Sequence, residues 1–221
     1  AIRRQRQMCI RDSQYIGNLS DYQNKNIKED RLRQYLRLKG YADKLIDAAV
    51  MQLQQEAGNL SRGVYDANKT VYSRLKYGIP VSESPEKPPV TVELIDEANP
   101  LNNDFAVAEE VTVVEQQEKR PDLVIYLNGI AVAVIELKRS SISVSEGIRQ
   151  NLTNQKDSFI RGFFTTMQFC MAGNESEGLR YGTLLTGEKF YMEWKDDGFK
   201  EHEEERDPVA VSYTHLRAHE T

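Results

Sequence analysis

Residues 120–138 read Arg120-Pro121-Asp122-Leu123-Val124-Ile125-Tyr126-Leu127-Asn128-Gly129-Ile130-Ala131-Val132-Ala133-Val134-Ile135-Glu136-Leu137-Lys138. Asn128-Gly129 stands between two apolar runs, which is the strongest short-range signal for a β-hairpin. The first run begins after Asp122, and the second ends at Glu136, with Lys138 two residues further on. Because the strands of a hairpin are antiparallel, the start of the first lies beside the end of the second. We therefore expect these three charged side chains to lie near one another.

The loop between the strands decides whether the charged side chains share one face of the sheet. A two-residue type I′ turn pairs Leu127 with Ile130. It places Asp122 opposite Ile135, so that this side chain points away from Glu136.

A three-residue loop with a glycine bulge gives the other register. It pairs Tyr126 with Ile130 and places Asp122 opposite Val134, on the face that carries the second acid. A shared site requires this arrangement, so we predict the bulged turn. Positive φ angles at both residues of Asn128-Gly129 would contradict it.

The chemistry of the three side chains depends on their place at the margin of a buried sheet. Two carboxylates a few Å apart repel by roughly 4 kcal/mol at an effective dielectric of about 20, which favours protonation or a bound divalent cation. Carboxylate oxygens suit Mg²⁺, which keeps several waters and binds phosphate oxygens. A nearby lysine can orient an attacking water and offset negative charge on a phosphate. The set Asp122, Glu136 and Lys138 therefore indicates metal-dependent chemistry, with a solvated, salt-bridged strand end as the alternative.

The segment before the hairpin has helical character. Residues 28–77 repeat apolar side chains at three- and four-residue steps, and Gly40, Gly58 and Gly78 stand where helices would stop. We predict two or three amphipathic helices in an N-terminal appendage over 14–79. Four prolines in 80–89 predict a linker there, because proline supports neither a helix interior nor a paired strand.

After Pro89 the apolar period changes to two, with many β-branched residues. Strand-like runs cover 90–95, 105–114, 123–127, 130–137, 163–171, 181–185 and 190–194, and one helix-like run covers 143–159. These runs predict an α/β (α+β) domain over 90–198, built on a central mixed sheet with one helix crossing it after the hairpin.

Both ends of the chain carry an unusual pattern. Residues 7–13 and 211–216 back-translate into strings that are nearly reverse complements, and they resemble a transposon-end sequencing adapter. We therefore expect 1–13 and 211–221 to be adapter-derived and leave them out of fold reasoning. Residues 199–210 are predicted to form a charged, solvated tail.

Composition excludes several classes of protein. The chain carries a net charge of −5, two cysteines and three histidines. Two cysteines cannot build a disulfide scaffold or a four-cysteine zinc site, and no apolar run has the length to span a bilayer. Outside the two ends only Cys170 and His202 remain, which disfavours histidine-based nucleophilic catalysis. We expect a soluble cytoplasmic protein with no membrane partner.

A family resemblance now becomes specific. Pro121-Asp122 and Glu136-Leu137-Lys138 match the PD-(D/E)xK nuclease signature. Over about residues 45–195 the sequence resembles the N-terminal nuclease region of the restriction (R) subunit of type I restriction-modification enzymes. The stretches that carry this resemblance are Ala67-Asn68, Tyr77-Gly78, Asn99-Pro100-Leu101-Asn102-Asn103-Asp104-Phe105, residues 120–138, Gly147-Ile148-Arg149-Gln150-Asn151, Phe163-Phe164, Met171-Ala172-Gly173-Asn174 and Gly178-Leu179-Arg180-Tyr181-Gly182-Thr183.

The resemblance implies a restriction-endonuclease-like mixed sheet and a Mg²⁺-dependent endonuclease acting on double-stranded DNA. It also implies that this chain is a fragment of a subunit whose downstream motor domains bind ATP and translocate DNA, and which works with methyltransferase (M) and specificity (S) subunits. This fragment is not expected to bind ATP, since residues 182–189 lack the Gly-Lys-Ser/Thr ending of a phosphate-binding loop.

Site roles follow from the resemblance by position. Asp122 and Glu136 would bind the metal, the Leu137 carbonyl would be a third ligand, and Lys138 would hold the attacking water. Nucleases of this group often carry Gln-x-x-x-Tyr on the next helix. Here Gln150 fits, and Asn154 stands in place of the tyrosine.

Two interpretations of Gln150 remain open. It could contact the site or DNA, or it could lie on a solvated helix face with Glu146 and Asn154, opposite the stripe of Val144, Ile148 and Leu152. Basic residues surround the predicted site despite the negative net charge, and we expect a DNA-binding rim there. Its members are Arg120, Arg139 and Arg149, with Lys119, Lys156 and Arg161 nearby.

The sequence also offers two further acids and an alternative function. Glu109 and Glu110 are weaker candidates for an additional metal-binding acid. The alternative function is a non-catalytic docking module that holds the motor against the M and S subunits, and it would show no carboxylate-dependent metal binding.

Overall fold

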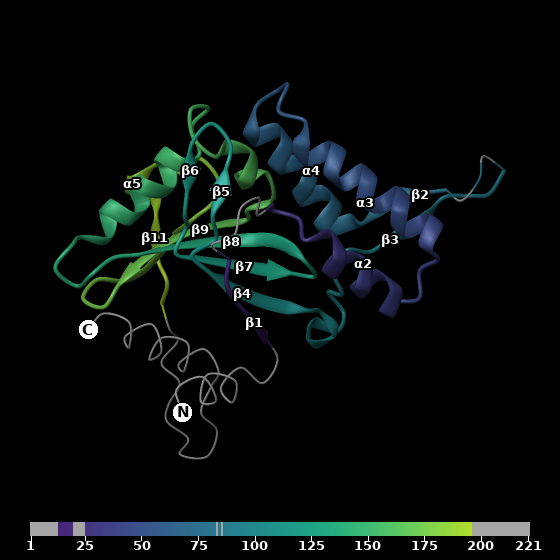
Figure 1. Ribbon diagram of the computed structural model, residues 1–221, viewed down its shortest axis with the longest axis horizontal. Helices are drawn as coiled ribbons and strands as arrows, with labels where there is room; N and C mark the ends of the chain where they lie inside the picture. The colour runs from purple at the N-terminus through teal and green to yellow at the C-terminus, as the bar shows by residue number, and fades with distance from the viewer. Residues whose placement is uncertain (1–12, 20–24, 83, 85, 196–221) are drawn as a thin grey trace, which may run out of the picture.

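A computed structural model describes residues 13–19, 25–82, 84 and 86–195 (Figure 1). Its centre is a seven-stranded mixed sheet in the order β1-β4-β7-β8-β9-β10-β11. The strands are β1 (Ser13–Asn18), β4 (Phe105–Glu109), β7 (Leu123–Leu127), β8 (Ile130–Leu137), β9 (Phe169–Asn174), β10 (Gly178–Gly182) and β11 (Met192–Glu193). β1 runs parallel to β4 and β8 runs parallel to β9, whereas the other neighbours are antiparallel. The predicted mixed α/β architecture is confirmed.

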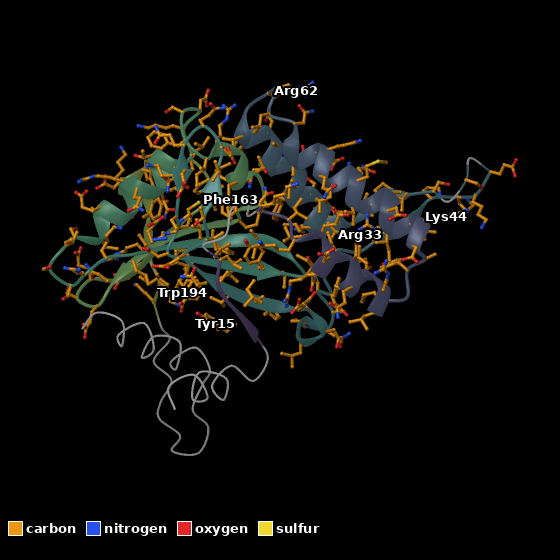
Figure 2. The ribbon with its side chains drawn as sticks, in the orientation of Figure 1. Tyr15, Arg33, Lys44, Arg62, Phe163 and Trp194 are labelled. Carbon is orange, nitrogen blue, oxygen red and sulfur yellow. The ribbon has the colours of Figure 1, made fainter. Side chains whose placement is uncertain are left out.

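One face of the sheet carries α5 (Val144–Asn154), the short hairpin β5 (Val113–Val114) with β6 (Glu118–Lys119), and the 3₁₀ helix η2 (Arg161–Thr166). α5 connects β8 to β9, because a parallel pair needs a crossover. Val113 and Phe163 pack with Val124 and Val134 in one core cluster on this face. In Figure 2, Phe163 lies on this side of the sheet, and Tyr15 and Trp194 lie on the other side.

Three helices form a unit beside the sheet, as the sequence predicts. They are α2 (Glu29–Leu38), α3 (Asp43–Gly58) and α4 (Val64–Tyr77). Gly40 and Gly78 follow helix ends with φ angles of 86° and 73°, a conformation that glycine adopts without strain. None of the helices in the described part of the chain is long and apolar enough to cross a membrane.

The N-terminal segment differs from the predicted all-helical appendage. β1 begins at Ser13 and joins the edge of the main sheet beside β4, and Ile27 forms a β-bridge with Ile130. The N-terminal segment is therefore part of the sheet as well as of the helical unit. The predicted tail over 199–210, His202 and most of the two adapter-like ends lie outside the described residues.

The prediction that Pro80 cannot pair is wrong. β2 (Ile79–Val81) pairs antiparallel with β3 (Val90–Val92), with Pro80 opposite Thr91. Pro80 is exposed on a two-stranded ribbon, where an edge position does not need the missing N–H. Val92 packs in one core cluster with residues of α2 and α3, so this hairpin belongs to the helical unit.

The segment 163–171 is also not one strand. η2 occupies its first part, and β9 begins only at Phe169. Phe163 and Phe164 are both buried, and an unbroken apolar run does not distinguish a buried strand from a buried turn. Two further 3₁₀ helices are η1 (Pro100–Asn102) and η3 (Glu188–Phe190).

Candidate metal centre at the open end of the β7–β8 hairpin

The β7–β8 hairpin turns through Asn128 and Gly129 with φ angles of 52° and 81°. Leu127 pairs with Ile130, so the turn has two residues and the predicted bulged turn is wrong. An Asn-Gly pair adopts positive φ at both positions without help from a longer loop.

The shared face arises from a bulge further along β8. Tyr126 pairs with Ala131, but Ile125 pairs with Ala133, so Val132 is an extra residue in the ladder. The register then continues to Leu123 opposite Ile135. One residue further, Asp122 lies opposite Glu136, and both side chains project from the same face.

Hydrogen bonds hold the open end of the hairpin together. The amide of Leu137 donates to Oδ2 of Asp122 at 2.7 Å. Nζ of Lys138 lies 4.0 Å from Oε2 of Glu136 and donates to Oε1 of Gln150 at 2.7 Å. The structure therefore brings Asp122, Glu136, Lys138 and Gln150 together, and Leu137 lies between the second acid and the lysine.

Glu136 is fully buried, with a relative exposure of 0%. Neither of its carboxylate oxygens has a hydrogen-bond partner among the described residues. Burial, followed by the negative charge of Asp122, raises the pKa of Glu136 to about 8, although Lys138 acts in the opposite direction. In the absence of a cation this carboxyl group is therefore mostly protonated at neutral pH.

α5 closes over the site because Gly147 allows close approach. A Cβ built on Gly147 would lie 2.9 Å from Cβ of Ala172 and 3.5 Å from Cβ of Glu136. The same helix carries Gln150 one turn later, within reach of Lys138. We did not predict this role for Gly147, although a glycine inside a helical apolar pattern is a signal of close packing.

The solvated-face interpretation of α5 holds for Glu146 but not for the other two residues. Glu146 is exposed, whereas Asn154 is buried at 2% exposure and Gln150 contacts Lys138. Asn154, which stands in the expected tyrosine position, has an Nδ2 with no hydrogen-bond partner among the described residues.

The three arginines of the predicted rim lie in different surroundings. Arg120 and Arg139 are exposed and directly flank Pro121-Asp122 and Lys138 in the chain. Arg149 is also exposed, but its guanidinium is paired with Glu188 at 2.8 Å and with Glu146 at 2.8 Å.

Glu109 and Glu110 do not join the site. Glu109 pairs with Leu123 and thus faces the other side of the sheet, where Tyr15 donates to it at 2.8 Å. The side chain of Glu110 accepts a hydrogen bond from Asn18. Among the described residues, no group of three or more acids, histidines or cysteines is arranged to hold a metal, so any ion at this site would need other donors.

Cys170 is not placed for nucleophilic chemistry. It is fully buried, and burial raises the pKa of its thiol to about 12. A thiol in this state is largely unreactive at neutral pH.

Fold and site together define an α/β domain with two acids and a lysine where two central strands of a mixed sheet meet, at the open end of the β7–β8 hairpin. The chain belongs to the family described as Type I restriction enzyme R protein N terminus (HSDR_N), which matches residues 3–190.

Individual relatives agree with this assignment. The chain is 34% identical over 97 residues to a candidate type I restriction enzyme endonuclease subunit (MjaIXP) of Methanocaldococcus jannaschii, covering 40% of this chain and 9% of the relative. It is 28% identical over 111 residues to the SauMSSORF170P endonuclease subunit of a type I restriction enzyme from Staphylococcus aureus strain MSSA476, covering 48% of this chain and 12% of the relative. The aligned region thus spans about a tenth of the length of these relatives.

Proposed function

We propose that this domain is a Mg²⁺-dependent endonuclease that hydrolyses phosphodiester bonds of double-stranded DNA within a type I restriction enzyme R subunit. The observation that carries the proposal is the Glu136 carboxyl group, fully buried and without a hydrogen-bond partner in the described chain, beside Asp122 and Lys138. A buried carboxylate without hydrogen bonds costs free energy, and protonation, a nearby cationic side chain such as Lys138 or a bound cation lowers this cost. Such a group near the end of a central strand is a candidate functional residue.

The donor set fits Mg²⁺. The carboxylates of Asp122 and Glu136 and the carbonyl of Leu137 would supply three hard oxygen ligands, which leaves positions for water and a phosphate oxygen. When bound, Mg²⁺ would supply Lewis-acid stabilisation of charge on the scissile phosphate. This incomplete set suits an ion that shares its shell with substrate.

Lys138 would orient the attacking water. Its ammonium has three N–H donors, and the bond to Gln150 uses one of them. The other two would remain for the water and for a phosphate oxygen. Gln150 thus acts as a positioning residue that keeps the ammonium beside Glu136.

Arg120 and Arg139 would bind the DNA backbone on either side of the acids. Arg149 would contribute less, because DNA must compete with its ion pairs to Glu146 and Glu188. ATP binding, DNA translocation and contact with M and S subunits would belong to the longer R subunit. Binding to DNA by the isolated domain should be weak and should fall as salt rises.

Titration calorimetry with MgCl₂ tests the proposal on the chain itself. We expect one Mg²⁺ to bind the wild type, and binding to be lost in Asp122→Asn and Glu136→Gln. Glu109→Gln is the matched control, because this acid is on a neighbouring strand but faces the other side of the sheet. Equal Mg²⁺ binding in all four proteins, or none in the wild type, would reject the metal centre and favour the docking module.

Cleavage tests the role of Lys138 in the complete R subunit. We expect Lys138→Ala to lose DNA cleavage by at least about a hundredfold while ATP hydrolysis continues, because transition-state stabilisation by one group contributes on this scale. Cleavage at the wild-type rate would remove Lys138 from the mechanism.

A further inference from the structure

β8 changes its neighbour at the residue where it bulges. At its N-terminal end, β8 pairs with the segment 26–28, through Ala131 N to Asn26 O at 2.8 Å and Lys28 N to Gly129 O at 2.7 Å. Beyond the bulge its neighbour is β9, beginning with Ala133 opposite Phe169. The carbonyl of Val132 accepts a hydrogen bond from the amide of Gln168 at 2.7 Å. Val132 therefore lies where the pairing of β8 changes from the segment 26–28 to β9.

The bulge at Val132 decides whether the two acids meet. The turn alone pairs Leu127 with Ile130, and an unbroken ladder from there would place Asp122 opposite Ile135. The extra residue moves the register by one, so that Asp122 lies opposite Glu136. A one-residue change of register transfers a side chain to the other face of a sheet.

Burial of apolar side chains specifies this register only weakly. Residues 130–135 of β8 are all apolar, and each is buried or half-buried. Both faces of this part of the strand are therefore covered. A strand with two apolar faces loses little burial in a slip, so other contacts must select the register.

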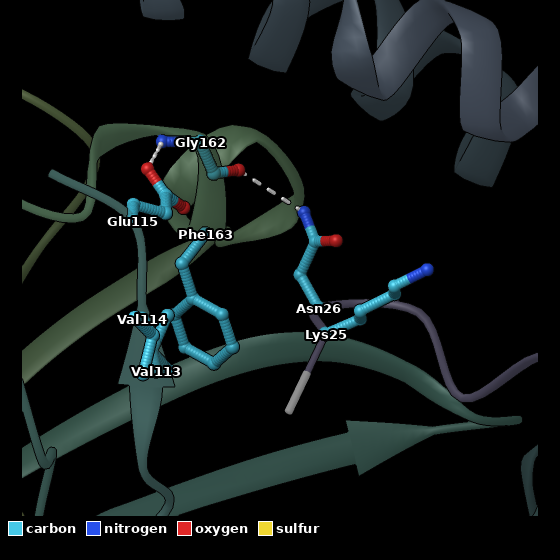
Figure 3. Close-up of a pocket in the computed structure, with 7 residues that line it drawn as sticks. All are labelled: Lys25, Asn26, Val113, Val114, Glu115, Gly162 and Phe163. Atoms are coloured by element: carbon cyan, nitrogen blue, oxygen red, sulfur yellow. Dashed lines mark hydrogen bonds between the residues drawn. The ribbon is translucent and has the colours of Figure 1, made fainter. Parts of the chain in front are cut away.

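Asn26 connects the contacts on both sides of the bulge. Its carbonyl accepts a hydrogen bond from the amide of Ala131. Its side-chain Nδ2 donates to Gly162 O at 3.2 Å and to Thr165 Oγ1 at 2.9 Å. Figure 3 shows the Asn26 side chain directed at the carbonyl of Gly162. Both residues line a cleft of about 240 Å³. Gly162 and Thr165 belong to η2, which leads directly into Gln168.

We propose that Asn26 is a positioning residue that holds the bulge at Val132 between the segment 26–28 and η2, and thereby sets the register that places Asp122 beside Glu136. The consequence for catalysis rests on the function proposed above, whereas the register itself does not. Loss of the Asn26 amide frees the segment 26–28 from η2 and lets Val132 enter the ladder.

The first test compares Asn26→Ala with Asn68→Ala in the full chain. Asn68 is a matched control, because its Nδ2 also donates to the η2 region, at Thr165 O and Met167 O, from a helix that does not pair with β8. Cross-strand nuclear Overhauser contacts report the register. In the bulged form, which the structure shows, Leu123 gives contacts to Ile135. In the slipped form, where Val132 has entered the ladder, Leu123 gives contacts to Val134.

We expect Asn26→Ala to show the slipped contacts and to bind Mg²⁺ about tenfold more weakly, the scale expected for loss of the two part-buried hydrogen bonds of its amide. Asn68→Ala should keep the bulged contacts and the wild-type Mg²⁺ affinity. Unchanged contacts in Asn26→Ala, or equal changes in both variants, would overturn the proposal. If the wild type binds no Mg²⁺, the proposed function fails. The nuclear Overhauser contacts of Leu123 still show whether Asn26 sets the register.

Deletion of Val132 supplies a second, independent test. Without this residue an unbroken ladder from the two-residue turn already places Asp122 opposite Glu136, so the bulge is no longer needed. We expect Asn26→Ala to have no effect on Mg²⁺ affinity in the deletion background. The same tenfold loss there would overturn the proposal, and if circular dichroism shows an unfolded deletion variant, the comparison with Asn68→Ala decides alone.

Discussion

Glu136 has an ionisable side chain that is completely buried. This burial raises the pKa of its carboxyl group and makes it the central acid of the candidate site. Its position after an apolar run predicted a place at the margin of the sheet. The sequence did not indicate that α5 would cover it, because that depends on Gly147 meeting Ala172. The residue types of the site were therefore predictable, and the environment of its central acid was not.

The raised pKa of Glu136 predicts a pH-dependent stability in metal-free buffer. The folded state binds this proton more tightly than the unfolded state, with a pKa of about 8 against an ordinary value of 4.5. The stabilisation is therefore complete at pH values below about 4.5 and is lost as pH rises through about 8. Between pH 6 and 8 we expect wild type to lose about 2 kcal/mol more of unfolding free energy than Glu136→Gln.

Urea unfolding at the two pH values measures this difference. Glu109→Gln, whose acid faces the other side of the sheet, should follow the wild type. Parallel pH profiles for wild type and Glu136→Gln would show that Glu136 keeps an ordinary pKa in the folded protein.

Gly129 is a second residue whose identity the fold requires. It has a φ of 81°, and an added Cβ would lie 2.6 Å from Lys28 O and 2.8 Å from Leu32 N. We expect Gly129→Ala to cost about 3 kcal/mol, because both backbone strain and overlap with backbone atoms contribute. Gly40→Ala is the control, since Gly40 has a φ of 86° but open space around it, and should cost only about 1 kcal/mol. Similar midpoints for the two variants in urea would show that the close approach at Gly129 has no cost.

Among the elements, the β7–β8 hairpin shows what local pattern does and does not specify. Asn128-Gly129 predicted both the hairpin and its place in the chain. The route to a shared face was predicted wrongly, as a bulge in the turn, whereas the structure has a type I′ turn and a bulge at Val132. The difference arises because the bulge is held by hydrogen bonds from residues distant in sequence.

α5 provides the prediction at the level of an element. Gly147→Ala should push the helix away from β9 and β8, and weaken the contact between Gln150 and Lys138. We expect a loss of stability of about 1–3 kcal/mol and a weaker affinity for Mg²⁺. Gly58→Ala serves as control, because no atom lies within 4 Å of its added Cβ and alanine favours helix by about 1 kcal/mol. Calorimetry and urea unfolding measure both quantities, and an unaltered Mg²⁺ affinity in Gly147→Ala would separate helix packing from the site.

For the whole molecule, the helical unit and the sheet share one buried connection. Ile130 of β8 packs in the same core cluster as residues of α2 and α3. The fully buried Asn128 donates to Leu94 O and Asn103 Oδ1 and accepts from Asp104 N. The hairpin that carries the acids is therefore anchored in the helical unit at its closed end.

This connection predicts a single cooperative unfolding transition for the described part of the chain. Helical ellipticity reports mainly α2 to α4, with a smaller part from α5, and the fluorescence of Trp194 reports the far end of the sheet beside β11. Asn128→Ala removes the three hydrogen bonds of this fully buried side chain, so we expect a loss of about 2–4 kcal/mol seen equally by both probes. Separate midpoints for the two probes, in wild type or variant, would show independent units.

The sequence by itself determined the hairpin, the helical character of residues 28–77, the mixed α/β class and the nearness of Asp122, Glu136 and Lys138. These features depend on short spacings and on residue types, which are local properties of the chain. The tertiary structure alone decided the bulge at Val132, the strand at Pro80, the place of β1 in the sheet and the burial of Glu136. The bulge, the place of β1 and the cover over Glu136 depend on contacts with other parts of the chain, and the β2–β3 hairpin packs against α2 and α3. No local pattern carries the free energy of such contacts.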